Sequence, residues 1–327
     1  MVTRRDLLKA GAAAGVVASS VGRAFADMPA PTTAVDFDVP AGSCDCHVHV
    51  FPDPAEFPFS PGRGYTPPTA SPKELLRLQE SLHLDRVVIV TPSVYATDNR
   101  ATLAGMRELG PQRARGIAVI DDKTSTEALD EMQKAGVWGV RINLEQAGVF
   151  DPAAASKKLE ATVSRIKDRG WHVQMYTRLA VLGALADQLA NQPVPLVFDH
   201  FGGARAELGT QQPGFDKLVE LVRSGKAYVK ISGSYRASNK APDYPDVAPL
   251  AKALIAANAE RIVWGSDWPH PDAAKVAGRD PIKDIAPPLP IDDGRVLNLL
   301  PTWTADAATR HKILVENPAR LYGFASA

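Results

Sequence analysis

The chain has 327 residues, 45% of them hydrophobic and 23% charged, and its 37 Lys and Arg residues balance 37 Asp and Glu residues. This composition excludes an intrinsically disordered chain and argues against a nucleic-acid-binding protein, because phosphate backbones select a basic excess. The two cysteines are too few for a disulfide framework or a Cys-rich zinc module, and no apolar run reaches the roughly 18 residues of a membrane helix.

Residues 1–26 are predicted to be a twin-arginine export signal peptide. Arg4 and Arg5 precede Lys9, and a mild Ala-rich apolar stretch follows. That stretch is too short to remain in a bilayer, and Ala24-Phe25-Ala26 has the small-x-small pattern of a cleavage site. We therefore expect transit through the twin-arginine export machinery and a mature protein that is periplasmic or secreted, with no membrane attachment after cleavage. The alternative is a frayed amphipathic helix.

Past residue 40, short apolar segments alternate with longer helical ones. The predicted strands are rich in Val and Ile and cover residues 44–50, 87–90, 116–120, 137–144, 172–177, 195–199, 228–231 and 261–264. Between them, apolar residues recur at spacings of three and four, which predicts helices over 72–82, 124–135, 154–169, 179–189 and 215–223.

Eight strand–helix units predict an α/β fold, a single-domain (β/α)₈ TIM barrel over residues 42–325, preceded by a leading arm at 27–41. A doubly wound open sheet is the alternative, although the chain has no GxGxxG or GxxxxGK[ST] motif. Two Pro-rich segments, 51–68 and 281–301, follow the first and last strands. In a barrel these positions adjoin the site-forming ends of the strands, so we expect both segments to cover a site.

The first predicted strand carries both cysteines and a histidine pair. A disulfide between Cys44 and Cys46 would need a bent backbone, so we expect two reduced, buried thiols. In His47-Val48-His49 the two imidazoles are on alternate residues and should project to the same side of the strand. Two clustered imidazoles suit zinc binding or direct polarisation of a carbonyl.

Two further motifs end later strands. Asp199-His200-Phe201-Gly202-Gly203 closes the sixth strand and should direct His200 into the barrel mouth, with a capping Asp and a packed His as the alternative. Gly265-Ser266-Asp267-Trp268-Pro269-His270 closes the eighth, and Asp267 beside imidazoles suits a general base or a metal ligand; its alternative role is a helix N-cap. The motifs predict one pocket shared by three imidazoles and a carboxylate.

Together, the HxH, the His after strand six and the GSDxPH after strand eight resemble the amidohydrolase superfamily. The resemblance extends from Gly42 to the sequence NPARLY at 317–322. Within that superfamily, the chain further resembles the lactone-processing branch. The residues that carry this resemblance are FPF at 57–59, GYTPP at 64–68, ATDNR at 96–100 and GVRIN at 139–143.

The resemblance implies that Asp267 is the general base that activates water, and that His47, His49 and His200 polarise a lactone carbonyl. It also implies substrate-binding roles for Tyr65, Ser93, Arg141, Tyr176, Arg236 and His270. An arginine fork binds a carboxylate bidentately. Dicarboxylate lactonases of the branch carry an Arg shortly after the strand-six His, where this chain reads Gly202-Gly203-Ala204-Arg205, and an Asn at the position of His270.

The function implied is hydrolysis of a small carboxylated lactone in aromatic or sugar-acid catabolism. We expect either no required cofactor or one divalent metal such as Zn²⁺ on His47, His49 and Asp267. Tyr176 occupies the place of the strand-five His of binuclear members, which argues against two metals. The alternatives are a lactone isomerase on the same barrel, a metal-dependent decarboxylase and an inactive periplasmic ligand-binding barrel.

Overall fold

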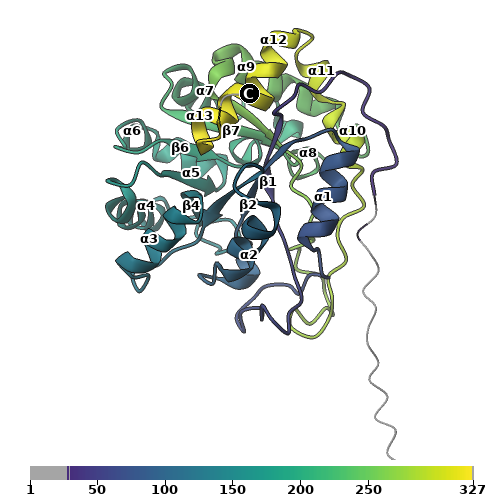
Figure 1. Cartoon of the computed structure of the whole chain (residues 1–327). Helices are drawn as coiled ribbons and strands as arrows, with labels where there is room; N and C mark the ends of the chain where they lie inside the picture. Colours follow the sequence, from purple (N-terminus) through teal and green to yellow (C-terminus); the bar gives the residue numbers. More distant parts are fainter. Residues whose placement is uncertain (1–27, 29, 326–327) are drawn as a thin grey trace, which may run out of the picture.

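The computed structural model describes residues 28 and 30–325. Its centre is an eight-stranded parallel sheet in which each strand pairs with the next in chain order, ringed by helices (Figure 1). The strands are β1 (Cys44–Val48), β2 (Arg86–Val90), β3 (Ala114–Ala118), β4 (Val137–Asn143), β5 (His172–Tyr176), β6 (Leu196–Phe198), β7 (Ala227–Ser232) and β8 (Ile262–Gly265). The predicted export peptide lies outside the described residues.

The sheet closes where β1 meets the segment that follows β8. Val48 pairs with Trp268 in parallel, the Asp267 amide donates to the His47 carbonyl at 2.8 Å, and the His49 amide donates to the Trp268 carbonyl at 2.8 Å. The predicted TIM barrel is therefore confirmed, and the open-sheet alternative is wrong. The same closure brings the first and last sequence motifs together.

The strands are nearly continuous buried runs, such as Val87 to Val90, because helices cover the outer face and side chains fill the interior. One irregularity stands out: the pairing of β1 with β2 shifts register between Asp45 and Val48. Such bulges re-aim side chains beside active sites. This one falls at the histidine pair.

Helices fill the crossovers and begin at side chains that cap them. Ser71 forms a capping box with Glu74 ahead of Pro72, and Asp151 caps the helix that starts at Pro152. The helices of eight or more residues are α1 (Pro72–Ser81), α2 (Arg100–Leu109), α3 (Thr126–Lys134), α4 (Pro152–Ile166), α7 (Phe215–Arg223) and α9 (Ala248–Ala257). The shorter ones are α5 (Leu179–Ala184), α6 (Ala186–Ala190), α8 (Ser234–Ala237), α10 (Asp293–Leu297), α11 (Leu300–Trp303), α12 (Ala307–His311) and α13 (Asn317–Tyr322).

The helix predicted over 179–189 is two helices, which corrects that prediction. Leu185 leaves helical geometry, with φ −101° and ψ 9°, and separates α5 from α6. Two residues earlier, a Cβ on Gly183 would lie 3.0 Å from the Gly214 Cα. The apolar spacing predicts which face of both helices is buried, but it does not predict the break between them.

The two Pro-rich segments lie side by side at one end of the barrel (Figure 1). Thr66 pairs with Ile285, and the Ala286 amide donates to the Thr66 carbonyl at 2.8 Å. The leading arm contacts the C-terminal part of the second segment, where the Thr33 hydroxyl donates to Asp292 at 2.7 Å. Segments near opposite ends of the sequence are thus in contact.

Cys44 and Cys46 of β1 are free and buried, as expected. They pack with Val88 and Val90 in a cluster that includes Tyr322 from the C-terminal segment. Among the described residues, no helix is both long enough and apolar enough to cross a membrane.

Candidate active site

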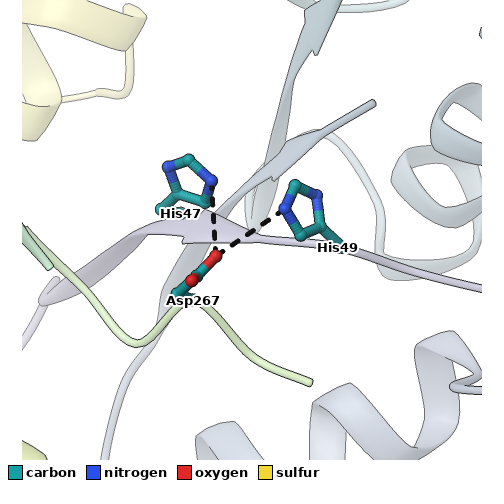
Figure 2. A group of neighbouring side chains, drawn as sticks. All are labelled: His47, His49 and Asp267. Atoms are coloured by element: carbon teal, nitrogen blue, oxygen red, sulfur yellow. Dashed lines mark ion pairs between the residues drawn. The ribbon is translucent and has the colours of Figure 1, made fainter. Parts of the chain in front are cut away.

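The carboxylate of Asp267 lies beside the histidine pair of β1. Its Oδ1 is 3.6 Å from Nε2 of His47 and 3.7 Å from Nε2 of His49. Figure 2 shows both imidazoles directed at this carboxylate, which comes from the segment after β8. Nε2 of His200 is 3.9 Å from the other oxygen, Oδ2. All four side chains are buried, so the predicted shared pocket is confirmed as a geometric arrangement.

The backbone holds Asp267 in a conformation that few L-residues adopt. Its φ is +67°, in the left-handed region. The buried carboxylate of Asp45 braces this turn, because its Oδ1 accepts from the amides of Ser266, at 3.0 Å, and His47, at 3.1 Å. The Ser266 hydroxyl accepts from the Trp268 amide at 3.0 Å. The start of the loop after β8 is therefore tied directly to β1.

The two oxygens of Asp267 have different surroundings. Oδ2 accepts from Nε of Arg236 at 2.5 Å and from the Tyr235 hydroxyl at 2.6 Å. Oδ1 has no hydrogen-bonding partner among the described residues. Burial by itself would raise the pKa of Asp267, but the Arg236 cation holds that pKa well below its usual range. The carboxylate is ionised, with one oxygen anchored and the other facing His47 and His49.

The imidazoles are held in the neutral form. Burial lowers the pKa of His49 to about 3 and that of His200 to about 4, and it lowers the pKa of His47 well below its usual value. Nδ1 of His49 lies 2.7 Å from the Val90 carbonyl, which only accepts, so Nδ1 carries the proton. Nε2 therefore presents a lone pair toward Oδ1 of Asp267. Two acceptors that face each other need a proton donor or a cation between them.

A buried network of charged side chains lies beside Nδ1 of His47. Asp199 Oδ1 lies 3.2 Å from Nδ1 of His47 and 3.6 Å from Nζ of Lys230. Its Oδ2 accepts from Nε of Arg141 at 3.3 Å and from Gln174 at 3.1 Å. Asp199 makes no side-chain cap bond to the helical turn after it. The capping role considered for it is therefore wrong, because its carboxylate instead lies among the Lys230 and Arg141 cations and Nδ1 of His47.

Five of the six predicted substrate-binding residues line one pocket with His49, His200 and Asp267. They are Tyr65, Ser93, Arg141, Tyr176 and Arg236. The sixth, His270, does not line it: its Nε2 lies 3.0 Å from the Asp293 carboxylate and its ring packs edge-on against Tyr235. The space at the carboxylate is about 20 Å³, the scale of a single water.

Comparison with known proteins identifies this arrangement. Residues 44–324 match the amidohydrolase family. The chain belongs to that family. It is 34% identical to a 4-sulfomuconolactone hydrolase of Hydrogenophaga intermedia over 88% of this chain and 90% of the relative. It is also 34% identical to a 2-pyrone-4,6-dicarboxylate hydrolase of Comamonas testosteroni over 88% of this chain and 92% of the relative. An apo crystal structure from Agrobacterium tumefaciens superposes with a TM-score of 0.77 at 30% identity, covering 91% of this chain and 99% of that one.

The donor set of this amidohydrolase fits one divalent metal. Ligand atoms of His47, His49 and Asp267 lie within 4.8 Å of one another. Two of those atoms, Nε2 of His47 and Oδ1 of Asp267, are buried and have no hydrogen-bonding partner among the described residues. Imidazole nitrogens with a carboxylate oxygen are ligands that zinc accepts. A second group, His47, Asp199 and His200, is equally close, but Lys230 and Arg141 already neutralise Asp199.

Sequence patterns missed three polar residues of the amidohydrolase site: Tyr235, Lys230 and Gln174. Tyr235 precedes Arg236, and its bond to Asp267 spans 32 positions. Lys230 is fully buried. The one sign of its role in the sequence is that it interrupts an apolar strand, since a lysine in a central strand needs partners. Its Nζ donates to Gln174 at 2.7 Å and to the Cys46 carbonyl at 2.8 Å.

Proposed function

We propose that this amidohydrolase hydrolyses a small lactone that bears a carboxylate, with Asp267 as the general base. The observation that carries the proposal is that the two carboxylate oxygens of Asp267 have different partners. Arg236 and Tyr235 hold Oδ2, while Oδ1 faces the Nε2 atoms of His47 and His49. The lactone-hydrolase names of the relatives favour the same substrate class.

In the proposed reaction a water hydrogen-bonded to Oδ1 attacks the lactone carbonyl carbon, and Asp267 takes one of its protons. The C–O bond to the ring oxygen then breaks, and Asp267 returns the proton to that oxygen, giving a hydroxy acid. Negative charge that develops on the carbonyl oxygen must be stabilised by preorganised groups. His47, His200 and the Arg236 guanidinium are the groups of this chain placed to supply that stabilisation, whereas Nε2 of His49 carries no proton to donate.

Arg141 is the cation best placed to bind the substrate carboxylate. It is 6% exposed, lines the pocket and lies with its guanidinium carbon 5.7 Å from the Tyr176 ring centre. Arg141 contacts Asp199 only through Nε, at 3.3 Å, whereas Arg236 is held by Asp267 at 2.5 Å. Tyr65 and Ser93 line the wall beside Arg141 and supply hydroxyl donors. This side of the pocket can therefore fix the orientation of a carboxylated ring.

A divalent metal, when bound, would be held by His47, His49 and Asp267 and would act as a Lewis acid that polarises a carbonyl and acidifies water. The roles of Arg236, Tyr235 and Arg141 in orienting the base and the substrate do not depend on it.

The test is a set of lactones with zero, one or two carboxylates, incubated with the purified protein before and after chelator treatment and followed by proton NMR. Ring-opened acid from carboxylated lactones supports the proposal. An isomeric lactone as sole product would make the protein an isomerase, carbon dioxide release would make it a decarboxylase, and saturable binding without product would make it a binding protein. Metal analysis of the same samples reports the cofactor.

We also propose that residues 1–26 export the folded protein. The support is the sequence pattern around Arg4 and Arg5. Fractionation of cells that express the full chain and the Arg4→Lys/Arg5→Lys variant tests this. Periplasmic protein that is lost in the variant supports export, whereas equal cytoplasmic retention of both contradicts it.

A further inference from the structure

A second cavity opens from the catalytic pocket on the side of β5 and β6. It has a volume of about 420 Å³ and shares Tyr176, His200 and Arg236 with the catalytic pocket. We call it the side lobe. Its remaining wall comes from the segments after β5 and β6, with Glu145 from the segment after β4. Because the catalytic pocket itself has a volume of about 20 Å³, a ring substrate must extend outside it.

The charged groups of the side lobe pair with one another. Nε of Arg178 lies 3.2 Å from Glu145, and the guanidinium of Arg178 stacks on Phe150 at 3.6 Å from the ring centre. Nη2 of Arg205 lies 3.5 Å from Glu207, and Nη1 of Arg205 donates to the Arg236 carbonyl at 3.3 Å. Arg236 itself holds Asp267. Each arginine of the lobe thus already faces a carboxylate, and Glu145 would repel a second anionic group.

Apolar side chains make up much of the remaining wall. Leu179 and Ala204 are buried in it, while Ala180 and Pro213 are exposed toward solvent. Leu208 is 58% exposed, the largest exposure among the large hydrophobic residues of the described chain. An exposed leucine at the rim of a cavity that opens from a catalytic pocket indicates contact with an apolar ligand group.

The backbone at Gly203 leaves no room for a charged side chain at this position of the lobe. Its φ is +78°, and a Cβ there would lie 2.2 Å from the Thr177 carbonyl oxygen. No side chain fits at this position without moving the end of β5. Position 203 therefore cannot supply a cation to the lobe.

We infer that the side lobe binds an apolar substituent, an alkyl or aryl group, carried by the lactone. This inference rests on the proposed function and narrows its substrate class. The substrate would place its carboxylate on the Arg141 side and its apolar group between the β5 and β6 loops. Selectivity would then favour a monocarboxylated lactone with an apolar substituent over a dicarboxylated one.

The test compares kcat/KM for a γ-lactone carboxylate with kcat/KM for its butyl derivative and for its derivative with a second carboxylate. The expected ratio of butyl to parent is at least about 10-fold, since even one methylene in an apolar pocket is worth that much. Leu208→Asp and Ala180→Asp place an acid on the exposed rim and should reduce the ratio by about 10-fold. Val276→Asp, the same kind of change at a 46% exposed residue outside the lobe, should leave it unaltered.

Three results would overturn the inference: a butyl-to-parent ratio near one, a ratio unchanged by both rim variants, or preference for the dicarboxylate that Arg205→Gln removes. Calorimetric measurement of ligand affinity distinguishes failure of this inference from failure of the proposed function. If no lactone is opened, the proposed function fails, but the butyl-substituted γ-lactone carboxylate should still bind at least about 10-fold more tightly than the parent γ-lactone carboxylate, and Leu208→Asp should erase the difference. Equal affinities would refute the lobe assignment independently of turnover.

Discussion

Nε of Arg236 lies 2.5 Å from Oδ2 of Asp267, so the carboxylate carries a fixed cation on one oxygen while its other oxygen faces two imidazoles. The pairing lowers the basicity of the carboxylate and also prevents its rotation. A base of this kind is weak but oriented, and proton transfer from a positioned water depends first on geometry. In the proposed reaction, Arg236 would therefore act through Asp267.

Asp267→Asn tests the base directly. The amide retains the size of the side chain and can still accept from Arg236, but it cannot take a proton from water. We expect kcat to fall at least about 10³-fold, with an unchanged circular dichroism spectrum. Lactone hydrolysis within 10-fold of the wild-type rate would show that another group is the base.

Tyr235→Phe removes the 2.6 Å hydrogen bond to Asp267 and keeps the ring that packs on His270. A hydrogen bond to the ionised form lowers a pKa, so its loss should raise the pKa of Asp267. The acid limb of the kcat/KM profile should move to higher pH, because the base is then protonated over a wider range. An unmoved limb with a lower plateau would assign Tyr235 to packing alone.

Arg141→Met should affect substrates according to their charge. Methionine keeps much of the aliphatic volume but cannot pair with a carboxylate. We expect KM for carboxylated lactones to rise about 10- to 100-fold, the worth of a charged hydrogen bond, and KM for neutral lactones to change much less. Equal increases for both substrates would mean that Arg141 does not bind the anion.

Lys230 and Asp199 should couple strongly in stability. Both are fully buried and lie 3.6 Å apart. Lys230→Met removes one partner of a buried pair and should lower the free energy of unfolding by about 3 kcal/mol or more. Adding Asp199→Asn should recover part of that loss, because the carboxylate that has lost the Lys230 charge is then neutral. Denaturant unfolding of the four proteins measures the coupling, and strictly additive effects would contradict it.

His172 should make stability depend on pH. Burial, and after it the Lys230 charge, lowers its folded-state pKa to about 3 from an ordinary 6.5. Between those values the unfolded chain binds a proton that the folded chain does not, so stability falls as pH falls, by up to about 1.4 kcal/mol per pH unit. Above pH 7 the histidine is neutral in both states.

Urea unfolding of the wild type and His172→Gln from pH 4 to 8 measures this contribution. The variant should show a shallower slope below pH 6.5 and a parallel curve above pH 7. Identical slopes below pH 6.5 would mean that His172 is protonated in the folded protein.

The barrel and the core of the site were readable from local patterns. Eight Val- and Ile-rich runs separated by helical spacing favour a parallel barrel, because helical crossovers make the strands parallel and eight such units can close on themselves. His47 and His49 share a side through the two-residue period of a strand. Asp267 and His200 follow strands whose ends must meet at one mouth, so the motifs also indicated that these four side chains would meet.

The tertiary structure decided how those side chains are paired and held. Nothing local in the sequence joins Tyr235 to Asp267 or Lys230 to Asp199, because these contacts depend on loop paths and on the need to satisfy buried charge. The break at Leu185 and the turn of His270 toward Asp293 have the same origin. Periodicity reports which face is buried, whereas the partner of a buried polar group is chosen by the packing of the whole fold.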